Sequence, residues 1–430
     1  MMMRIVIAPD KFKGSLRATE VAAAIAAGLR AGLAGAERPG AERPGTELVT
    51  IPVADGGDGT VDAAVAAGFE RVLVTAAGPL GEPARASYAR RGEVAVIELA
   101  CVCGLMRLPG GRREPLAASS FGLGEVLRAA LEAGARRIIL GIGGSASTDG
   151  GAGLLQALGA RMLDARGEPL GRGLGGDVGR GAALGEVAAL DLTGLHPALR
   201  SCSLTIATDV DNPLTGPSGA AEVYGPQKGA TPAQVRELAR GLAHWAVVVA
   251  SATGTETAAT DWSQAPGSGA AGGVGFAARA VLGAESRPGI GLVLDLVGFD
   301  AALAGAALVI TGEGSLDTQS LSGKAPVGVA RAAARGGTPV VAVAGRSTLT
   351  AAQLAAAGIT AVYPLSDLEP DPARSSAEAS VLLERVGRAI ARDRLAGPLR
   401  TDTTDAPEDR RLRANRTGEP AGRRLSRAES

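Results

Sequence analysis

Segments with the hydrophobic patterns of strands and of helices alternate along almost the whole chain. Residues 4–8 form a short apolar run typical of a buried strand, and residues 21–29 repeat apolar side chains at helical spacing. The same alternation returns between residues 306 and 391. Residues 71–99 differ, because three short alternating segments follow one another there without helical spacing between them. Alternating strands and helices predict a parallel sheet covered by helices, and the interruption predicts a second domain with an antiparallel or mixed sheet.

These patterns predict an α/β protein with two unlike α/β domains. The two ends of the chain share the parallel-sheet pattern, so we expect residues 1–75 and 290–395 to join in one flavodoxin-like, Rossmann-like domain. Residues 76–289 would form the inserted α/β domain with the mixed sheet. The segment 396–430 is charged and polar, which predicts a disordered tail. A tandem repeat of Ala-Glu-Arg-Pro-Gly at 36–45 predicts a lengthened surface loop.

Charge and hydropathy narrow the classes of partner. The 44 Lys and Arg residues balance the 44 Asp and Glu residues, so the chain lacks the basic field that gathers nucleic acid or anionic lipid. Its apolar runs are shorter than the roughly 20 residues that cross a membrane, and its start enters a strand without a signal peptide. The few Cys and His residues show no zinc-ligand spacing. We therefore expect a cytoplasmic protein that acts on a small molecule, with no nucleic-acid or membrane partner.

The segment 311–324 stands between an apolar run and a helical segment that has Pro in its first turn. A loop in this position faces the free N–H groups and partial positive charge of a helix N-terminus, which favour anions. Lys324 suggests a phosphate there, and Glu313 and Asp317 suggest a metal ion beside it. The segment is not a Walker P-loop, because Thr318 stands where that motif needs its first Gly. These residues predict a protein that uses a nucleotide without a P-loop.

Two loops near the N-terminus place charged residues immediately before a helical segment. In the loop 8–15, Lys11 and Lys13 could hold an anionic substrate or phosphate, although a solvated turn capped by Ser15 explains this loop better when it is taken alone. The loop 54–60 crowds two carboxylates among three glycines. Such a loop suits Mg²⁺ or the proton of a hydroxyl, with a plain turn as the alternative.

Two further loops follow strand-like segments in the middle of the chain. The loop 141–151 combines glycines, hydroxyls and one acid, and its free N–H groups predict a site for an oxyanion. In the loop 207–216, Asp209 and Asp211 alternate at strand spacing, so both side chains are expected on one side. That arrangement suits a metal ion or a general base, although Asp-Asn-Pro is also ordinary turn chemistry.

The loop 266–273 contains G-x-G-x-x-G at Gly267, Gly269 and Gly272. This motif could indicate a dinucleotide, and with it a nicotinamide-dependent dehydrogenase acting on a hydroxy acid. The context is wrong, however, because residues 260–265 are not a buried strand. A helix-entry loop at a domain junction is the better interpretation.

Taken together, the loops resemble those of the bacterial type I glycerate kinase family. The shared motifs are APDKFKGSL (8–16), PVADGGDGT (52–60), GGSASTDGGAG (143–153), ATDVDNPLTGPSGA (207–220), YGPQKGAT (224–231), PGSGAAGG (266–273), RPGIGLVLDL (287–296) and ITGEGSLDTQSLSGK (310–324). They occur in the order of the family and extend over nearly all of the chain from Arg4 to about Arg392. Such ordered coverage is far more specific than any one motif.

The resemblance implies phosphorylation of D-glycerate by ATP with Mg²⁺, with 2-phosphoglycerate as the usual product. It also implies a site in the cleft between two unlike domains. Asp58 stands where Glu is expected in the family, and Ser315 where Arg is frequent, which changes the reach of one acid and removes one phosphate contact. A glycerate 3-kinase, and a non-catalytic protein that senses a hydroxy acid on the same fold, are the alternatives.

We expect the chemistry to depend on a small set of acids and lysines. Lys13 and Lys324 would hold phosphate or the glycerate carboxylate, and either Asp209 or Asp317 would act as base on the accepting hydroxyl. The remaining candidates are Asp211 and Asp58 as Mg²⁺ ligands and, as residues that bind substrate or nucleotide, Lys11, Ser15, Asp55, Gly56, Gly57, Gly144, Ser145, Asp149, Gly150, Asn212, Glu313 and Gln319. The choice of base, the loop that holds ATP and the oligomeric state stay open at this point.

Overall fold

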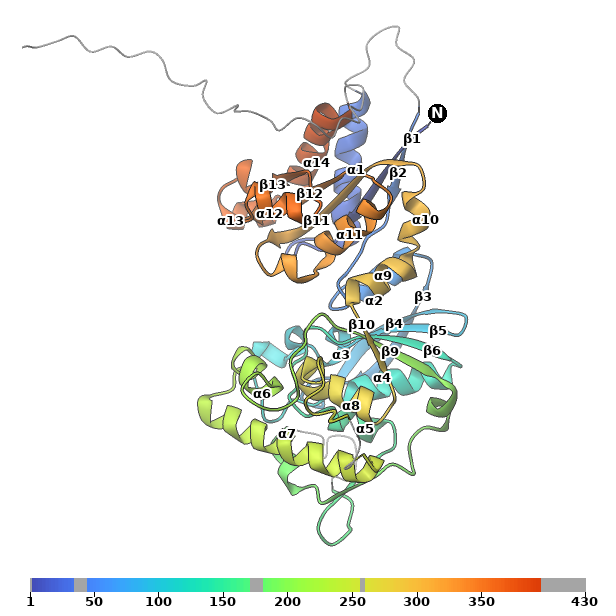
Figure 1. Ribbon diagram of the computed structural model, residues 1–430, viewed down its shortest axis with the longest axis vertical. Helices are drawn as coiled ribbons and strands as arrows, with labels where there is room; N and C mark the ends of the chain where they lie inside the picture. The colour runs from blue at the N-terminus through green and yellow to red at the C-terminus, as the bar shows by residue number, and fades with distance from the viewer. Residues whose placement is uncertain (1, 35–44, 171–180, 256–259, 396–430) are drawn as a thin grey trace, which may run out of the picture.

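The computed structural model describes residues 2–34, 45–170, 181–255 and 260–395 of the 430-residue chain. Most of the duplicated segment 36–45, and the whole of the tail predicted at 396–430, lie outside these residues. Two sheets with their helices form two lobes, which Figure 1 shows one above the other. None of the helices in the described ranges is long and apolar enough to cross a membrane.

The first sheet joins the two ends of the chain. Its strands are β1 (Met3–Pro9), β2 (Thr46–Thr50), β11 (Ala306–Leu316), β12 (Val340–Ser347) and β13 (Ala361–Pro364). They are all parallel, in the order β13, β12, β11, β1, β2. β1 pairs Ile5 with Leu308 and Ile7 with Ile310, so the N- and C-terminal parts of the sequence share one core. The predicted domain built from both chain ends is confirmed.

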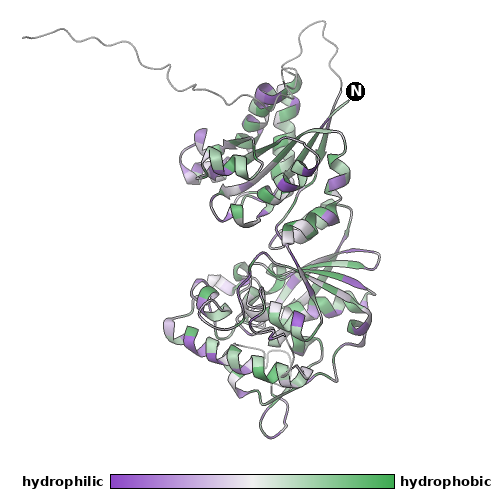
Figure 2. Ribbon diagram, viewed as in Figure 1, coloured by the Kyte–Doolittle hydropathy of each residue, from purple (hydrophilic) through white to green (hydrophobic). Residues whose placement is uncertain are grey.

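Helices cover both faces of this sheet, because side chains alternate along each strand. The helices of this lobe are α1 (Ala18–Ala34), α9 (Gly289–Val297), α10 (Phe299–Leu303), α11 (Ala325–Arg335), α12 (Ala351–Ala356), α13 (Pro372–Ala377) and α14 (Ala379–Ile390). Ile5 and Ile7 pack with α1 and α14 on one face, and Val6 and Ala8 pack with α9, α11 and α12 on the other. Figure 2 shows the resulting pattern, with hydrophobic strands inside and hydrophilic residues on the outer side of helices such as α14.

The second sheet is mixed, as predicted. Its strands are β3 (Glu70–Ala77), β4 (Pro83–Arg91), β5 (Val94–Glu98), β6 (Arg137–Gly141), β9 (Ser203–Ala207) and β10 (Glu285–Arg287). β3, β4 and β5 pair antiparallel, and β5, β6, β9 and β10 pair parallel. A separate antiparallel pair consists of β7 (Arg161–Leu163) and β8 (Ala189–Asp191).

The second lobe has one core at the sheet and another beneath α7. Its helices are α3 (Ala100–Cys103), α4 (Phe121–Glu132), α5 (Ala152–Ala157), α6 (Ala220–Tyr224), α7 (Pro232–Thr253) and α8 (Val274–Ala280). Leu123 and Leu127 of α4 pack against Ile97 and Ile138 of the sheet. Trp245 of α7 belongs to the other core. Helix α7 lies on the side of this lobe away from the first lobe (Figure 1).

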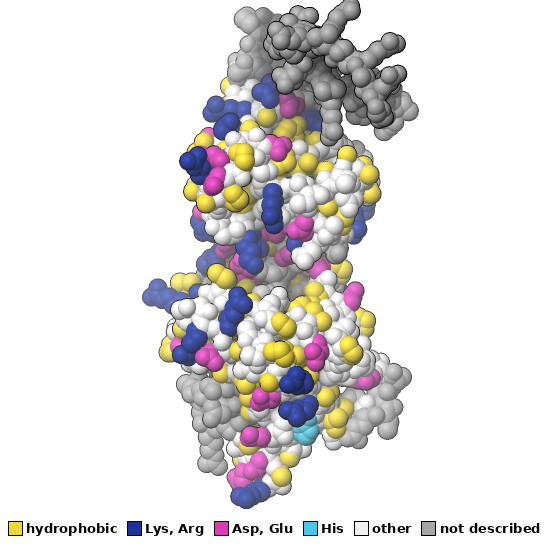
Figure 3. Space-filling model, turned by 90° about the vertical axis from the view of Figure 1, so that its left-hand side faces the viewer, with side chains coloured by type: hydrophobic (Ala, Val, Ile, Leu, Met, Phe, Trp, Pro, Cys, Tyr) yellow, Lys and Arg dark blue, Asp and Glu magenta, His cyan; other side chains and the backbone are white. Residues whose placement is uncertain are grey.

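Helices α2 (Thr60–Ala66) and α9 lie between the two sheets (Figure 1). Ile290 and Val293 of α9 belong to the core of the first lobe, whereas Leu292 packs with Ile139 of the second sheet. Both lobes therefore share this junction. Figure 3 shows it as a narrow waist where acidic and basic side chains gather.

The strand pairing in the two sheets can be compared with the predicted domain limits. β3 pairs as a whole in the second sheet, so the boundary predicted after residue 75 falls inside a strand, and the chain enters the second sheet at Glu70. The boundary predicted at residues 289 and 290 coincides with the start of α9. The predicted limits of the two domains all stay predictions.

Candidate active site

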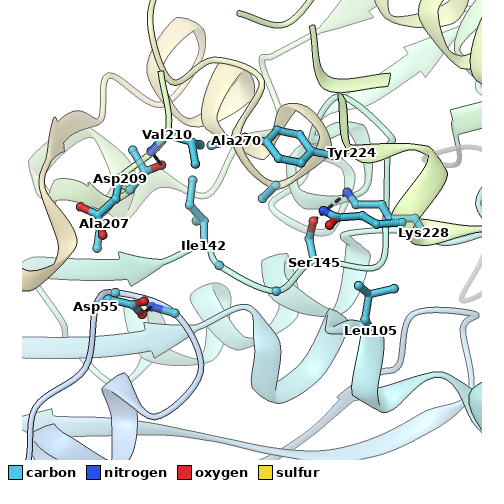
Figure 4. A pocket seen from close by; sticks show the side chains of 17 residues that line it. Asp55, Leu105, Ile142, Ser145, Ala207, Asp209, Val210, Tyr224, Lys228 and Ala270 are labelled. Carbon is cyan, nitrogen blue, oxygen red and sulfur yellow. Dashed lines mark hydrogen bonds between the residues drawn. The ribbon is translucent and has the colours of Figure 1, made fainter. Parts of the chain in front are cut away.

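A pocket of about 220 Å³ lies beside the junction of the two lobes (Figure 4). Three of the loops that line it follow parallel strands, namely β2, β6 and β9. The predicted site residues among its lining are Asp55, Gly56, Gly57, Gly144, Ser145 and Asp209. Open α/β sheets bind ligands at the carboxyl ends of their strands, which is where these loops stand.

The loop after β2 approaches the second lobe so closely that glycine is required at two positions. A Cβ on Gly289 would lie 1.9 Å from the carbonyl oxygen of Asp55, and a Cβ on Gly56 would lie 2.8 Å from the Cβ of Ala207. Gly56 also has a φ of 87°, which L side chains rarely adopt. This close approach brings Asp55 within electrostatic range of Asp209 on the second lobe.

Asp209 is the acid of this pocket whose titration is shifted most clearly. Its carboxylate accepts a hydrogen bond of 2.9 Å from the backbone N–H of Gly289, at the start of α9. Burial of the carboxylate raises the pKa of Asp209 to about 6, and the charge of Asp55 raises it further, against the effect of this hydrogen bond. A carboxylate with a pKa near the working pH suits a general base.

Lys228 lies across the pocket from these acids (Figure 4). Its ammonium group donates a hydrogen bond of 2.8 Å to Ser145 Oγ and another to the carbonyl oxygen of Ser147. The residue is only 3% exposed. Burial lowers the pKa of Lys228 to about 7, and the charge of Asp149 opposes that shift.

The sequence-based prediction omitted Lys228, although it stands in the motif at 224–231. Four of the 44 basic residues of the chain are lysines, and they are Lys11, Lys13, Lys228 and Lys324. All four lie in loops that the motif analysis singled out. All other basic residues of the chain are Arg, and that contrast could have pointed to Lys228.

Asp149, predicted to bind substrate or nucleotide, is fully buried, and its carboxylate oxygens accept hydrogen bonds from the protein itself. It accepts hydrogen bonds from the N–H and hydroxyl groups of Ser120, both 2.7 Å long, and from the N–H groups of Gly151 and Gly153. These bonds fasten the start of α5 to the start of α4. Gly150 also serves this packing, since its carbonyl accepts a hydrogen bond from the Trp245 indole. The geometry gives Asp149 the role of holding the 143–151 loop in shape.

Replacing Asp149 by Asn should destabilise the fold by about 3 kcal/mol, because one oxygen that now accepts backbone hydrogen bonds would become a donor in a buried site. Urea unfolding followed by circular dichroism measures the change. Asp164→Asn is the matched control, since Asp164 also accepts bonds from two backbone N–H groups but in an exposed turn. Equal stability of the two variants would contradict the buried role of Asp149.

A second group of charged residues lies at the carboxyl ends of the strands of the first sheet, which we call the edge of the first sheet. Asp10, directly after β1, is 6% exposed, and burial raises the pKa of Asp10 to about 7. The Lys11 ammonium, 3.7 Å from Asp10 Oδ1, opposes this shift, whereas Asp55 and Glu313 add to it. Lys11 also contacts Asp58, with 3.9 Å between Nζ and Oδ2. Lys11, Lys13 and Ser15 of this loop were predicted as site residues, and Asp10 was not.

Glu313, within β11, lies beside this group. Ser320 donates a hydrogen bond to Glu313, and burial raises the pKa of Glu313, with the Lys324 charge acting in the opposite direction. Lys324 stands immediately before α11. Asp317 uses Oδ1 to accept a 2.9 Å hydrogen bond from the N–H of Gln319, so part of its carboxylate shapes the turn.

Glu98 is a further residue that the sequence analysis missed. It is buried at the end of β5, and one of its oxygens accepts hydrogen bonds of 3.1 Å from the N–H groups of both Gly59 and Val61. Burial raises the pKa of Glu98 to about 7. Its carboxylate fixes the start of α2, and with it the loop that presents Asp55.

Several predicted residues lie outside this pocket. Lys13 and Ser15 face a different pocket beside α13 and α14, where Ser15 Oγ donates a 2.7 Å hydrogen bond to the Ser376 carbonyl. Asn212 is held within its own loop by Tyr224, whose hydroxyl lies 2.6 Å from Asn212 Oδ1. The predicted catalytic residues are therefore spread over three places: Asp209 in the pocket, Asp317 and Lys324 at the edge of the first sheet, and Lys13 beside α14.

The two predicted metal ligands do not share a site with a third ligand. Asp58 is exposed beside Lys11, and Asp211 faces a hollow lined by Arg287 and Arg331. Across the described residues, no three His, Cys, Asp or Glu side chains are grouped so that they could hold a metal ion. A metal that arrives with phosphates needs only one or two protein carboxylates, and Asp10, Asp55 and Glu313 could supply them.

Comparison with known proteins agrees with this arrangement. A family model described as "Glycerate kinase family" matches residues 5–395 of the chain. Glycerate kinase of Bacillus subtilis is 42% identical over 90% of this chain and 97% of its own length. Glycerate 2-kinase of Escherichia coli is 44% identical over 84% of this chain and 90% of its own length.

A solved structure shows the same architecture. The crystal structure of a protein described as glycerate kinase 2, from Salmonella typhimurium LT2, is 41% identical and superposes with a TM-score of 0.75. The match covers 91% of this chain and 98% of that one. The range matched by the family model includes both lobes and every loop of the candidate site. The chain belongs to the glycerate kinase family.

Proposed function

We propose that this protein transfers the γ-phosphoryl group of ATP to the 2-hydroxyl of D-glycerate, giving 2-phosphoglycerate. The observation that supports this most directly is the pocket in which Asp55 and Asp209 face a glycine-rich loop at the junction of the lobes. Its small volume suits a three-carbon acid. Membership of the family supports the substrate, and the name of the Escherichia coli relative, glycerate 2-kinase, supports the position of transfer.

In this proposal Asp209 is the general base. The substrate hydroxyl attacks the γ-phosphorus, its proton passes to the Asp209 carboxylate, and ADP leaves. The hydrogen bond from Gly289 fixes the orientation of the carboxylate, and burial keeps its pKa close to neutrality. Asp317 is the weaker candidate, because its Oδ1 is used within the turn at Gln319.

The edge of the first sheet is the proposed place for the ATP phosphates. Lys324 stands before the N-terminus of α11, where unpaired backbone N–H groups favour an anion. Lys11 adds a second ammonium group. Mg²⁺ would enter with ATP as part of the substrate. The chemistry of Asp10 and Glu313 fits it, since a cation would offset the burial and the neighbouring carboxylates that raise their pKa values.

Phosphorus NMR of the purified protein with D-glycerate, ATP and Mg²⁺ tests the proposal. We expect one new phosphate ester on the secondary hydroxyl, with ADP formed in equal amount. An ester on the primary carbon would keep the kinase and replace the 2-kinase by a glycerate 3-kinase. No reaction although glycerate binds would favour the hydroxy-acid sensor instead. ADP formation without any ester would refute transfer to glycerate.

A further inference from the structure

Lys228 is a buried cation that forms no ion pair with a carboxylate of the described residues. Two of its N–H groups are used, by Ser145 Oγ and by the Ser147 carbonyl, and both acceptors are uncharged. The ion pairs formed among the described residues do not include it. Asp149 is the nearby charge that acts on it, but the oxygens of Asp149 already accept bonds from Ser120, Gly151 and Gly153.

Keeping an ammonium group in such a place is costly, because burial removes its hydration without supplying an opposite charge. The lowered pKa of Lys228 is the measure of that cost. An ammonium group has three donors, and the third has no acceptor among the described side chains and backbone. A small anion entering the pocket would satisfy both the charge and this donor.

The position of Lys228 decides which part of a ligand could meet it. It lines the same pocket as Asp55 and Asp209, and Figure 4 shows it on the opposite side from these two acids, next to Ser145 and Tyr224. The pocket is therefore polar at both ends, with a cation at one end and carboxylates at the other. A hydroxy acid has the complementary arrangement, with an anionic group at one end and hydroxyls at the other.

We propose that Lys228, held in place by Ser145, binds the carboxylate of the hydroxy-acid substrate and so turns the hydroxyl groups towards Asp209. This inference rests on the proposed function and assigns the residue that selects an acid over a neutral polyol. It replaces Lys13 and Lys324, expected from the sequence as possible partners of the carboxylate, by a lysine inside the pocket. Lys228 is the most deeply buried of the four lysines.

Calorimetric titration of the purified protein with D-glycerate and with D-glyceramide, its neutral amide, tests this role. Both ligands carry the same hydroxyls and differ in the charge that Lys228 would meet. We expect the unmodified protein to bind D-glycerate about 50-fold more tightly than the amide. In Lys228→Met, affinity for D-glycerate should fall by about 50-fold while affinity for the amide stays within about twofold, so the preference disappears.

Two further variants separate binding from structure. Arg236→Met removes one positive charge from the exposed surface of α7, and its preference should equal that of the unmodified protein. Ser145→Ala keeps the ammonium group but removes the hydroxyl that orients it. Its preference for D-glycerate should fall several-fold, and this variant keeps the inference testable if Lys228→Met does not fold.

An unchanged preference in Lys228→Met, or an equal loss of affinity for both ligands, would overturn the inference, since the lysine would then serve packing alone. Ester formation is followed separately by phosphorus NMR. If the unmodified protein forms the ester but Lys228→Met still prefers D-glycerate, the carboxylate role is refuted and the kinase is left intact. A preference that depends on Lys228, without any ester, would leave the role intact and refute the kinase. Failure of the unmodified protein to bind D-glycerate would refute both.

Discussion

Replacing Asp209 by Asn should lower kcat by about 10²- to 10⁴-fold, the contribution expected of one positioned general base. Asn has the shape of Asp and can still accept the hydrogen bond from the Gly289 N–H, so the loop should keep its geometry. Only the capacity to take a proton is lost. Initial rates with D-glycerate and ATP, measured over a range of both substrates, separate kcat from KM.

Asp62→Asn is the control for this variant. Asp62 lies on α2, one of the two helices between the sheets. It forms an exposed ion pair with Arg71, which contributes little to stability. It should retain nearly full activity. A kcat of Asp209→Asn within about tenfold of the unmodified enzyme would exclude Asp209 as the base and return Asp317 to that role.

The pH profile gives an independent check on the same residue. A base must be deprotonated, so kcat/KM for D-glycerate should rise with pH through the pKa of Asp209, which burial and the charge of Asp55 place at about 6. Lys228 must be protonated to hold a carboxylate, so kcat/KM should fall again as pH rises through its pKa of about 7, which burial lowers against the charge of Asp149. The profile should be a narrow bell. Its alkaline side should disappear in Lys228→Met, and its acid side should stay.

The sequence predicted the loops of the site better than the residues within them. The loops at 54–60, 141–151 and 207–216 follow strands of two different sheets, and their glycines indicated close approach. That they meet in one pocket depends on α9, which packs on both cores. α9 was not predicted as a helix, and its nine residues include two glycines, which disfavour a helix.

Burial is what the sequence could not reveal. Asp10 and Lys228 stand in quoted motifs, yet each gains its altered pKa from distant segments that surround it: β11 for Asp10, and the 145–149 loop for Lys228. The reverse holds for Asp149. Its place in a glycine-rich loop suggested a ligand site, whereas Ser120, on a separate segment, supplies the donors that occupy it. Residue types and spacing therefore pointed to the loops of the candidate site, and tertiary packing decides which of their side chains are already bonded within the protein.

Replacing Lys324 by Met should lower kcat/KM for ATP by about 10³-fold, the second large effect that we expect. Phosphoryl transfer depends on neutralising charge on the phosphates, and loss of one preorganised donor commonly costs 10²- to 10³-fold. Lys324 stands at the start of α11, and its charge acts on the buried Glu313, so it lies next to the acids proposed to meet the cation of the nucleotide. Initial rates at varied ATP and saturating D-glycerate measure the effect.

Lys324→Met also tests which lobe binds D-glycerate and which binds ATP. Binding of D-glycerate by calorimetry should change less than about twofold in Lys324→Met, because the proposed carboxylate partner lies in the other lobe at Lys228. Arg385→Met, which removes a charge from the exposed side of α14, should leave kcat/KM for ATP and the affinity for D-glycerate unchanged. A large loss of D-glycerate affinity with an unchanged KM for ATP would reverse the assignment, placing the acid at the first sheet and the nucleotide in the pocket. If neither quantity changes, Lys324 lies away from the reacting groups, and the first sheet must hold the phosphates through Lys11 instead.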